Sequence, residues 1–552
     1  MTNRILTRLD RDEMLSFYQD GFWQDTTIYD RVRGFSMSSP TKVAIQEHDR
    51  SVTFAELVEA ADRFAAALRA HGVAQGDRVA VWLPSRIEVA VVVLACSRNG
   101  YICCPSLHRD HTVGEIVELL TRMNAVALVA QAGYGADADR RDIFAEAEKV
   151  ESLRLVAQLG ENVPGASDSR LFPQFSEFTD AGAEHTDPNT IVYLAFTSGT
   201  TGQPKGVMHS DNTLLAPVRS LVKDWALDED MVIYSLSPFS HNLGFGAMLL
   251  AMSGGGKLVV HDIPRGASVA DRMQETGATF VFGVPTHAID LLAELEKRTD
   301  SPLSRVKGFR VSGAAISSSV AQGLLDHGVV PQSGYGMTEA GSHHYTRQSD
   351  PTTLIVGSSG RPCAGHETII VSQEDPDVEV SSGTVGQIAS RGATIMLGYF
   401  DDQTSTEKSF NSSGWFLTGD LGWADDAGYL RITGRKKDVI IRGGHNIFPA
   451  KIENLAMQHD AVFKAAVIPV PDERLGEKVC LVVSLKPGVA VTGDDLLTHL
   501  DAVGLSKFDM PEYFLRIQDI PLLPSGKVYK RQLIQRLEND EISPTPIRFA
   551  SR

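Results

Sequence analysis

Short apolar runs rich in valine and isoleucine alternate along this chain with longer segments of helical pattern. Residues 78–83 are followed by a helical pattern over 85–99, and residues 280–284 by one over 286–298. This alternation is typical of strand–helix–strand units, whose helices cover the faces of a largely parallel sheet. The sequence therefore predicts an α/β fold.

The length of 552 residues exceeds what one hydrophobic core usually organises, so at least two domains are expected. Around 356–433 the pattern changes to short strands and glycine-rich turns, which indicates a β-rich subdomain. After the charged segment Gly434–Asp438 a mixed unit begins, with helical patterns near 449–458 and 493–502.

The predicted domain boundaries follow from these changes of pattern. We expect a large N-terminal domain over 1–433, made of two α/β subdomains and the β-rich subdomain. A hinge is expected at 434–438, followed by a small, mobile α+β C-terminal domain over 439–552.

Composition and charge limit the class of partner and the compartment. The formal net charge of -17 and pI of about 5.4 argue against nucleic acid or anionic membrane as the main partner. The first ten residues lack the apolar core of a signal peptide, and the longest apolar run, 89–96, is too short to span a bilayer. Five scattered cysteines indicate neither a disulfide framework nor a zinc site. We expect a cytoplasmic protein without membrane insertion.

A loop over 197–206, Thr-Ser-Gly-Thr-Thr-Gly-Gln-Pro-Lys-Gly, has the composition needed to bind a polyphosphate. Glycines let backbone N–H groups approach phosphate oxygens, hydroxyls add donors, and Lys205 adds a positive charge. The loop is not a Walker A motif, because two residues separate Gly202 from the lysine and glycine follows it. A Ser/Thr/Gly surface linker is the alternative for such a stretch taken alone.

Three further segments accompany this loop. Residues 332–340 read Gln-Ser-Gly-Tyr-Gly-Met-Thr-Glu-Ala, residues 415–420 read Trp-Phe-Leu-Thr-Gly-Asp, and residues 521–527 read Pro-Leu-Leu-Pro-Ser-Gly-Lys. With the loop, they resemble the motifs of the adenylate-forming superfamily of acyl-CoA synthetases, luciferases and peptide-synthetase adenylation domains. The resemblance covers essentially the whole chain.

The resemblance implies a reaction in two halves. A carboxylate attacks the α-phosphorus of ATP, and a thiol, usually coenzyme A, then displaces AMP from the acyl-adenylate. At about 3.5 Å two unit anions repel by about 5 kcal/mol at an effective dielectric constant near 20. The implied catalytic groups are therefore Lys205, Lys527 and a Mg²⁺ ion held by Glu339, with Thr338 bonding phosphate oxygens.

The resemblance also implies the nucleotide site. Tyr335 would stack on adenine, Asp420 would accept bonds from the two ribose hydroxyls, and Arg435 would contact ribose or phosphate. The small residues of the segment 312–316, Ser-Gly-Ala-Ala-Ile, would leave room for the base. The implied nucleotide-binding residues are Thr197, Ser198, Gly199, Thr200, Thr201, Gly202, Gly313, Ala314, Tyr335, Asp420 and Arg435.

The acid pocket implied by the resemblance includes His241 as a gate, Asn242 and Gly334. Asn242 resembles the branch that activates aryl acids, whereas residues 434–449 resemble ligases for cyclohexanecarboxylate and for short or medium fatty acids. A buried asparagine without a partner would cost about 1 to 3 kcal/mol. We therefore expect a cyclic acid with a hydroxyl or carbonyl group. The adjacent pair His343-His344 is interpreted as non-metal.

Domain rotation is implied because Lys527 occupies the space through which the thiol must approach. Lys437 falls at the expected hinge, and Gly443 and Gly444 match the segment that lines the CoA channel in acyl-CoA synthetases. A solvated charge and a β-turn are the respective alternatives.

The sequence thus predicts an AMP-forming acyl-CoA ligase, an acid-thiol ligase that uses ATP, Mg²⁺ and coenzyme A on a small carboxylic acid. We expect a monomer or homodimer with no nucleic acid partner. A free-standing adenylation enzyme that loads a carrier protein, an enzyme of only one half-reaction and a binding protein remain alternatives.

Overall fold

A large mixed sheet forms the centre of the protein in the computed structural model, which describes residues 6–48, 50–161, 171–197, 204–264, 266–313, 316–523 and 526–549. Its inner strands, from β1 to β13, run parallel, and antiparallel strands close both edges. In spatial order the strands are β15 (Arg361–Pro362), β14 (Gly341–Tyr345), β13 (Val330–Met337), β12 (Gly308–Val311), β11 (Phe280–Gly283), β9 (Val232–Ser235), β10 (Lys257–Val260), β1 (Val43–Glu47) and β2 (Arg50–Thr53).

A second sheet is parallel except for its last pair, which is an antiparallel hairpin. Its order is β6 (Leu155–Leu159), β5 (Ala125–Gln131), β3 (Arg78–Trp82), β4 (Ile102–Cys104), β7 (Ile191–Thr197) and β8 (Lys205–Ser210). The strand and helix expected at 78–83 and 85–99 are β3 and α4 (Ile87–Asn99), and those expected at 280–284 and 286–298 are β11 and α10 (Pro285–Leu295). The predicted α/β class is confirmed.

Helices cover both faces of these sheets. One core lies between the sheets, and it contains α2 (Ile28–Ser38), α3 (Phe54–Ala70), α4, α7 (Asp211–Asp224) and α8 (Asn242–Ser253). The outer face of the second sheet carries α5 (Val113–Arg122) and α6 (Ile143–Ala147). The outer face of the large sheet carries α9 (Val269–Thr276), α10 and α11 (Ser318–Asp326).

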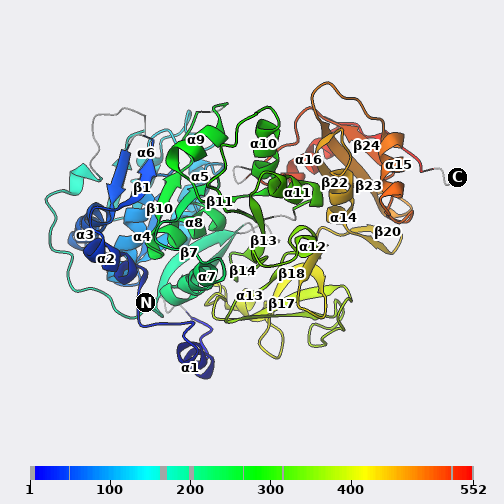
Figure 1. The fold of residues 1–552 in the computed structure, drawn as a ribbon. Coiled ribbons are helices and arrows are strands. Elements are labelled where there is room, and N and C mark those ends of the chain that lie inside the picture. The colour runs from blue at the N-terminus through cyan, green and yellow to red at the C-terminus, as the bar shows by residue number, and fades with distance from the viewer. Residues whose placement is uncertain are drawn as a thin grey trace.

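The expected β-rich subdomain is an antiparallel sheet of β16 (His366–Val371), β17 (Gly386–Gly392), β18 (Phe416–Ala424) and β19 (Leu430–Arg435). It lies below the large sheet in Figure 1, in yellow. Shorter elements fill the connections: α1 (Arg11–Gln19), the 3₁₀ turn Pro173–Phe175, α12 (Thr352–Gly357) and α13 (Gln403–Lys408).

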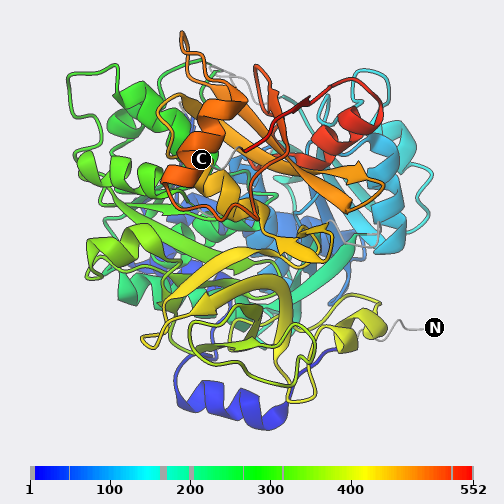
Figure 2. The ribbon, with the colours of Figure 1, turned by 90° about the vertical axis from the view of Figure 1, so that its right-hand side faces the viewer.

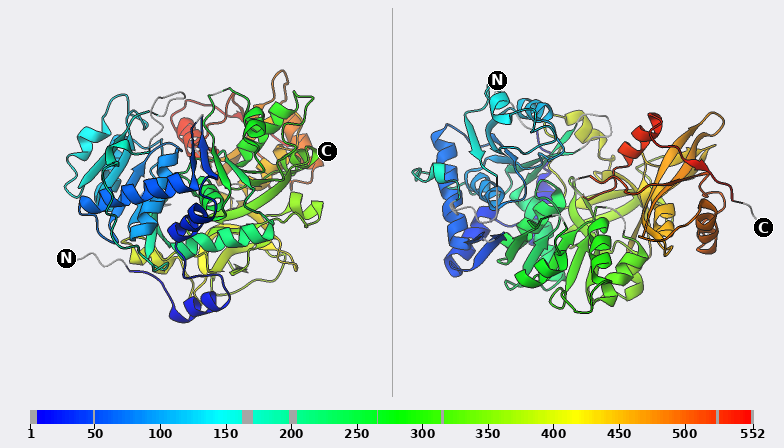
Figure 3. Two further views of the ribbon diagram at one scale, coloured as in Figure 1. Left: turned by 60° about the vertical axis from the view of Figure 1, so that its left-hand side comes forward. Right: turned by 90° about the horizontal axis from the view of Figure 1, so that it is seen from above.

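Residues 440–549 form a separate unit, which we call the small lobe. Its sheet contains β20 (Ile440–Arg442), β21 (His445–Ile447), β22 (Val462–Asp472), β23 (Gly476–Leu485), β24 (Tyr513–Arg516) and β25 (Thr545–Pro546), and its helices are α14 (Pro449–Ala456), α15 (Gly493–Ala502) and α16 (Lys530–Glu538). The small lobe has its own core. It faces the viewer above the β-rich sheet in Figure 2 and lies at one end of the molecule in Figure 3 (right).

The small lobe contacts α10 and α11, two helices on the outer face of the large sheet. Lys464 of β22 forms an ion pair with Asp290 of α10 at 3.0 Å, and the Ser319 hydroxyl lies 3.5 Å from the Met457 carbonyl. All five cysteines are buried and free. Among the described residues, no helix is both long enough and apolar enough to cross a bilayer.

Candidate active site

The predicted site residues gather at the carboxyl edge of the large sheet. Strands β9, β11, β12 and β13 are parallel, so the segments that follow them emerge at one edge. Gly313 follows β12, and Thr338 and Glu339 follow β13 in the turn to β14. His241 and Asn242 begin α8 after β9. Crevices at this edge are the usual ligand sites of open α/β sheets.

The predicted phosphate loop is held at both ends by the β7–β8 hairpin. Thr197 pairs with Lys205 in register, and the Thr197 hydroxyl lies 3.5 Å from the Lys205 carbonyl oxygen. The predicted residues Ser198, Gly199, Thr200, Thr201 and Gly202, and also Ala314, lie outside the described residues.

Tyr399 connects two of the predicted catalytic residues. The ammonium group of Lys205 lies 4.7 Å from the centre of the Tyr399 ring, and the Tyr399 hydroxyl donates to Glu339 Oε1 at 3.1 Å. Burial raises the pKa of the Glu339 carboxyl, a shift that its own backbone N–H and the Tyr399 hydroxyl partly offset.

The Glu339 carboxylate fits a role as magnesium ligand. Mg²⁺ is commonly held by one or two carboxylates together with substrate phosphates, and its charge would favour the ionised form that burial disfavours. Among the described residues, no group of three or more His, Cys, Asp or Glu side chains could hold a metal ion.

The adjacent histidines His343 and His344, interpreted from the sequence as non-metal, are buried against His366. Nε2 of His344 is hydrogen-bonded to the Thr368 hydroxyl at 2.8 Å.

A chain of hydrogen bonds connects the large sheet with the β-rich sheet. The Tyr335 hydroxyl donates to Asp420 Oδ2 at 2.9 Å, and Arg435 Nε donates to Asp420 Oδ1 at 3.0 Å. Asp420 and Arg435 are opposite each other in the β18–β19 register. Asp420 is buried, whereas the Arg435 side chain is about half exposed, at 49%. The three predicted nucleotide-binding residues therefore lie together, with one guanidinium edge open to a ligand.

Lys527 reaches the same edge from the small lobe. A Cβ built on Gly313 would lie 2.6 Å from Lys527 Cε, so a side chain there would displace the end of the lysine; the φ of +92° at Gly313 also favours glycine. The Thr286 hydroxyl of α10 donates to the Gly526 carbonyl oxygen at 2.5 Å. Burial and, to a smaller extent, the charge of Arg435 lower the pKa of Lys527 to about 8, and Asp420 partly offsets the shift.

Three stacked histidines lie at the N-terminus of α8. The rings of His241 and His108 are parallel within 8° with centroids 4.0 Å apart, and His111 stacks on His108 at 5.4 Å. Burial, followed by the charge of Lys527, lowers the pKa of His241 to about 4. Among the described residues, His241 Nε2 and His108 Nδ1 have no hydrogen-bond partner. Neither buried nitrogen is satisfied by a described protein group.

Other predicted residues lie away from this edge. Gly443 and Gly444 form the exposed turn between β20 and β21, and Lys437 is exposed between β19 and β20. The structure therefore brings Lys527, but not the two glycines, to the carboxyl edge.

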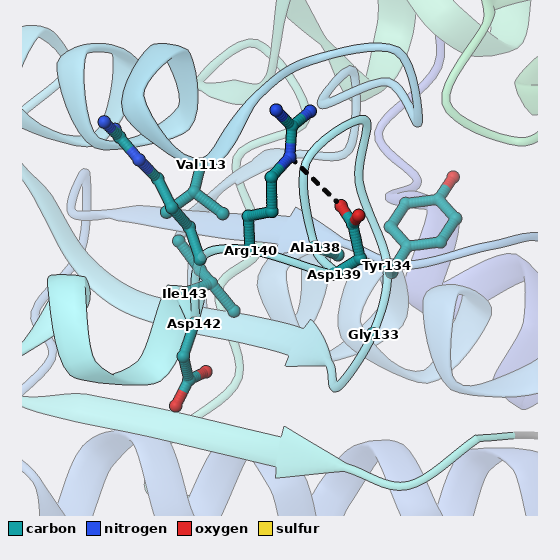
Figure 4. A pocket seen from close by; sticks show the side chains of 9 residues that line it. Val113, Gly133, Tyr134, Ala138, Asp139, Arg140, Asp142 and Ile143 are labelled. Carbon is teal, nitrogen blue, oxygen red and sulfur yellow. Dashed lines mark ion pairs between the residues drawn. The ribbon is translucent and has the colours of Figure 1, made fainter.

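A surface pocket of about 300 Å³ opens beside α6, close to the loop that carries His108 and His111. The Ala136 N–H donates to the His111 carbonyl at 3.0 Å, which connects the two features. Figure 4 shows Arg140 paired with Asp139 at its rim. The pocket shares none of its lining residues with the predicted site.

Sequence reasoning missed His108, His111 and Tyr399. His108 stacks on His241 and Tyr399 bonds to Glu339, both across segments distant in the chain, whereas His111 stacks on the nearby His108; none of the three belongs to the motifs described above. In the sequence these residues appear only as two histidines three residues apart after strand 102–104, and as a tyrosine in a Gly-Tyr-Phe segment.

Comparison with known proteins identifies the family. Residues 35–400 match the model of the AMP-binding enzymes, and residues 451–527 match the AMP-binding enzyme C-terminal domain. The medium-chain fatty-acid–CoA ligase of Escherichia coli is 29% identical over 97% of this chain and 96% of its own. The 3-[(3aS,4S,7aS)-7a-methyl-1,5-dioxo-octahydro-1H-inden-4-yl]propanoyl:CoA ligase of Mycobacterium tuberculosis is 33% identical over 90% and 96%.

A solved structure extends the similarity to the whole fold. ATP-bound MatB from Rhodopseudomonas palustris superposes with a TM-score of 0.82 at 28% identity, covering 93% of this chain and 99% of that one. The chain therefore belongs to the family of AMP-binding enzymes, among the adenylate-forming acyl-CoA ligases.

Proposed function

We propose that this enzyme activates a cyclic carboxylic acid bearing a polar substituent with ATP, and transfers the acyl group to coenzyme A with release of AMP. The observation that carries the proposal is the position of Lys527, a lysine of the small lobe buried beside Gly313 at the carboxyl edge of the large sheet. No other contact of the small lobe brings a cation to that edge within the described residues.

In the first half-reaction, Lys527 would lie between the substrate carboxylate and the α-phosphate and offset their repulsion. Lys205 would hold the terminal phosphates, Thr338 would donate to a phosphate oxygen, and Asp420 would accept the ribose hydroxyls. Mg²⁺, held by Glu339, supplies positive charge to the phosphates when bound.

In the second half-reaction, the small lobe would rotate about Lys437, withdraw Lys527 and bring Gly443 and Gly444 to the channel for the pantetheine arm. The proposed boundaries are 1–433, the hinge 434–438 and 439–552. They are supported by the end of β19 at Arg435, the start of β20 at Ile440, and the separate core of the small lobe.

The acid pocket is proposed to include His241, Asn242 and Gly334. His241 would gate and orient the acid instead of transferring protons, because burial keeps its ring neutral at neutral pH. The Mycobacterium tuberculosis relative is named for a cyclic acid with two oxo groups, which supports a ring with a carbonyl group.

The test is acid-dependent formation of AMP and acyl-CoA from ATP, Mg²⁺ and CoA, measured by mass spectrometry over fatty, alicyclic, benzoic and hydroxylated polycyclic acids. AMP together with acyl-CoA from a cyclic acid supports the proposal. Acyl-adenylate without thioester would assign the enzyme to carrier-protein loading. Equal affinity for a simple fatty acid and for every cyclic oxygenated acid would refute the proposed acid class.

A further inference from the structure

Arg310 is a fully buried cation in the middle of β12. Side chains alternate along a strand, and Phe309 and Val311 face the core beneath α9–α11. Arg310 therefore points to the opposite face of the sheet, where α8 packs on β9, β10 and β11. This is the face on which α8 begins with His241 and Asn242.

The guanidinium has more donors than partners. Its Nη1 donates to Gln332 Oε1, which lies directly opposite on β13, and its centre lies 5.3 Å from the Tyr345 ring centroid. Among the described residues, Nε and Nη2 of Arg310 and Nε2 of Gln332 have no hydrogen-bond partner. Each unpartnered buried donor costs about 1 to 3 kcal/mol, so a ligand that supplies oxygen acceptors would be favoured here.

The charge of Arg310 also lacks compensation. The ionisable neighbours acting on it are Tyr345 and Cys363, and burial raises the pKa of both, so they are neutral at neutral pH. Asp224 accepts from the Tyr345 hydroxyl but pairs with Arg347 at 2.7 Å. Burial lowers the pKa of Arg310 only to about 10, so it stays charged. A buried cation of this kind is stabilised by an anion or a strong dipole.

Gly334, a residue of the proposed acid pocket, lies directly against the guanidinium. A Cβ built at residue 334 would lie 3.1 Å from Arg310 Nη2, tighter than most real contacts. The absence of a side chain at 334 therefore lets the unpartnered donors lie directly against β13, beside a residue of the proposed acid pocket. Gln332 lies on the same face of β13, two residues before Gly334.

We propose that Arg310 and Gln332 determine acid specificity by binding a second oxygen acceptor of the substrate, a ketone or carboxylate oxygen, at the inner end of the pocket. The substrate class is then an oxo- or carboxy-substituted acid. The acceptor lies away from the carboxylate that is adenylated. This inference rests on the proposed function, whose acid pocket includes Gly334.

The experiment compares acids that differ only at the far end. The probes are cyclohexanecarboxylate, 4-oxocyclohexanecarboxylate and cyclohexane-1,4-dicarboxylate, with the propanoate homologues of all three to cover a deeper pocket. We expect kcat/KM for acyl-CoA formation to be at least about tenfold higher for an oxygenated acid than for its hydrocarbon parent, as expected for a hydrogen bond to a charged group. Equal or lower values for every oxygenated acid would overturn the inference.

Arg310→Met tests the residue itself. We expect it to abolish the preference through a higher KM for the oxygenated acid, while the hydrocarbon acid keeps its KM. Arg347→Met is the matched control, because Arg347 lies at 5.4 Å on the same Tyr345 ring but already has a carboxylate partner. It should lower the Tm without changing the preference. If both variants alter selectivity equally, Arg310 acts only through Tyr345 and the inference fails.

Two measurements protect the test from misfolding and from inactivity. Gly334→Ala keeps the charge but places a methyl group against Nη2, and it should reduce the preference even if Arg310→Met does not fold. Calorimetric binding of the same acids in the presence of a non-hydrolysable ATP analogue reports selectivity without turnover. Absence of thioester from every acid would refute the proposed function, whereas equal binding of oxygenated and hydrocarbon acids would refute the inference.

Discussion

The buried position of Lys527 predicts a specific pH dependence of adenylation. Its pKa is lowered from 10.5 to about 8, chiefly by burial. In the proposed first half-reaction the cation is the form that offsets the repulsion between carboxylate and phosphate, so activity is expected to require the protonated lysine. A lowered lysine pKa means that this form is lost as pH rises through about 8, more than two units earlier than for an exposed lysine. We therefore expect kcat/KM for ATP to fall about tenfold per pH unit above 8.

The assay is acid-dependent exchange of pyrophosphate into ATP between pH 6.5 and 10, which reports the first half-reaction alone. kcat/KM is the relevant parameter because it reports groups of the free enzyme. Lys527→Arg should remove the decline above pH 8 at a lower absolute rate, since guanidinium does not titrate in this range. Lys527→Ala should abolish exchange but leave thioester formation from supplied acyl-adenylate largely intact. The reasoning is refuted if the arginine variant declines as the wild type does, or if both half-reactions are lost equally.

Three further predictions follow from neighbouring contacts. Asp420 raises the pKa of Lys527, so Asp420→Asn should shift the decline in exchange to lower pH. Arg435 lowers that pKa, so Arg435→Gln should shift the decline to higher pH. Unchanged pH profiles in both variants would contradict the assigned contacts. Gly444→Trp should block thioester formation and spare exchange, with Gly444→Ala as control for the backbone strain at its φ of +86°; normal transfer by the tryptophan variant would exclude the channel role. His108→Leu should raise the KM for the acid about two- to tenfold by removing a stacking partner worth about 0.5 to 1.5 kcal/mol, and His108→Phe should restore it; an effect on ATP alone would argue against an acid-gating stack.

Much of the fold could be predicted from periodicity. The helices expected near 449–458 and 493–502 are α14 and α15, and the apolar run 89–96 lies inside the buried helix α4. The C-terminal strand could not be predicted in this way: β25 pairs with β24, and Ile547 packs against the small-lobe core. Two prolines and few large apolar residues concealed a strand whose partner is about 30 residues away.

The site was only partly predictable, for a physical reason. Motif residues such as Asp420 and Lys527 could be named because the short segments around them resemble those of a known family. Arg310 gave no signal, since a lone arginine in a strand of small and apolar residues looks like a solvated edge position. Its burial depends on packing by Tyr345 and on the register with Gln332, which depend on segments 22 to 35 residues further along the chain.

Because Lys527 is buried when the small lobe is docked, the free energy of docking depends on the charge of this lysine. A shift from 10.5 to about 8 corresponds to a cost on the order of 3 kcal/mol for keeping the cation in the docked position. The Lys464–Asp290 pair across the interface involves an aspartate that is 53% exposed, and such surface pairs contribute about 0 to 1 kcal/mol. Bound phosphates would remove the cost by pairing with the lysine. In the proposed mechanism ATP would thus favour the docked lobe and release of pyrophosphate would weaken docking, so that the charge of the substrate itself would set the order of the two half-reactions.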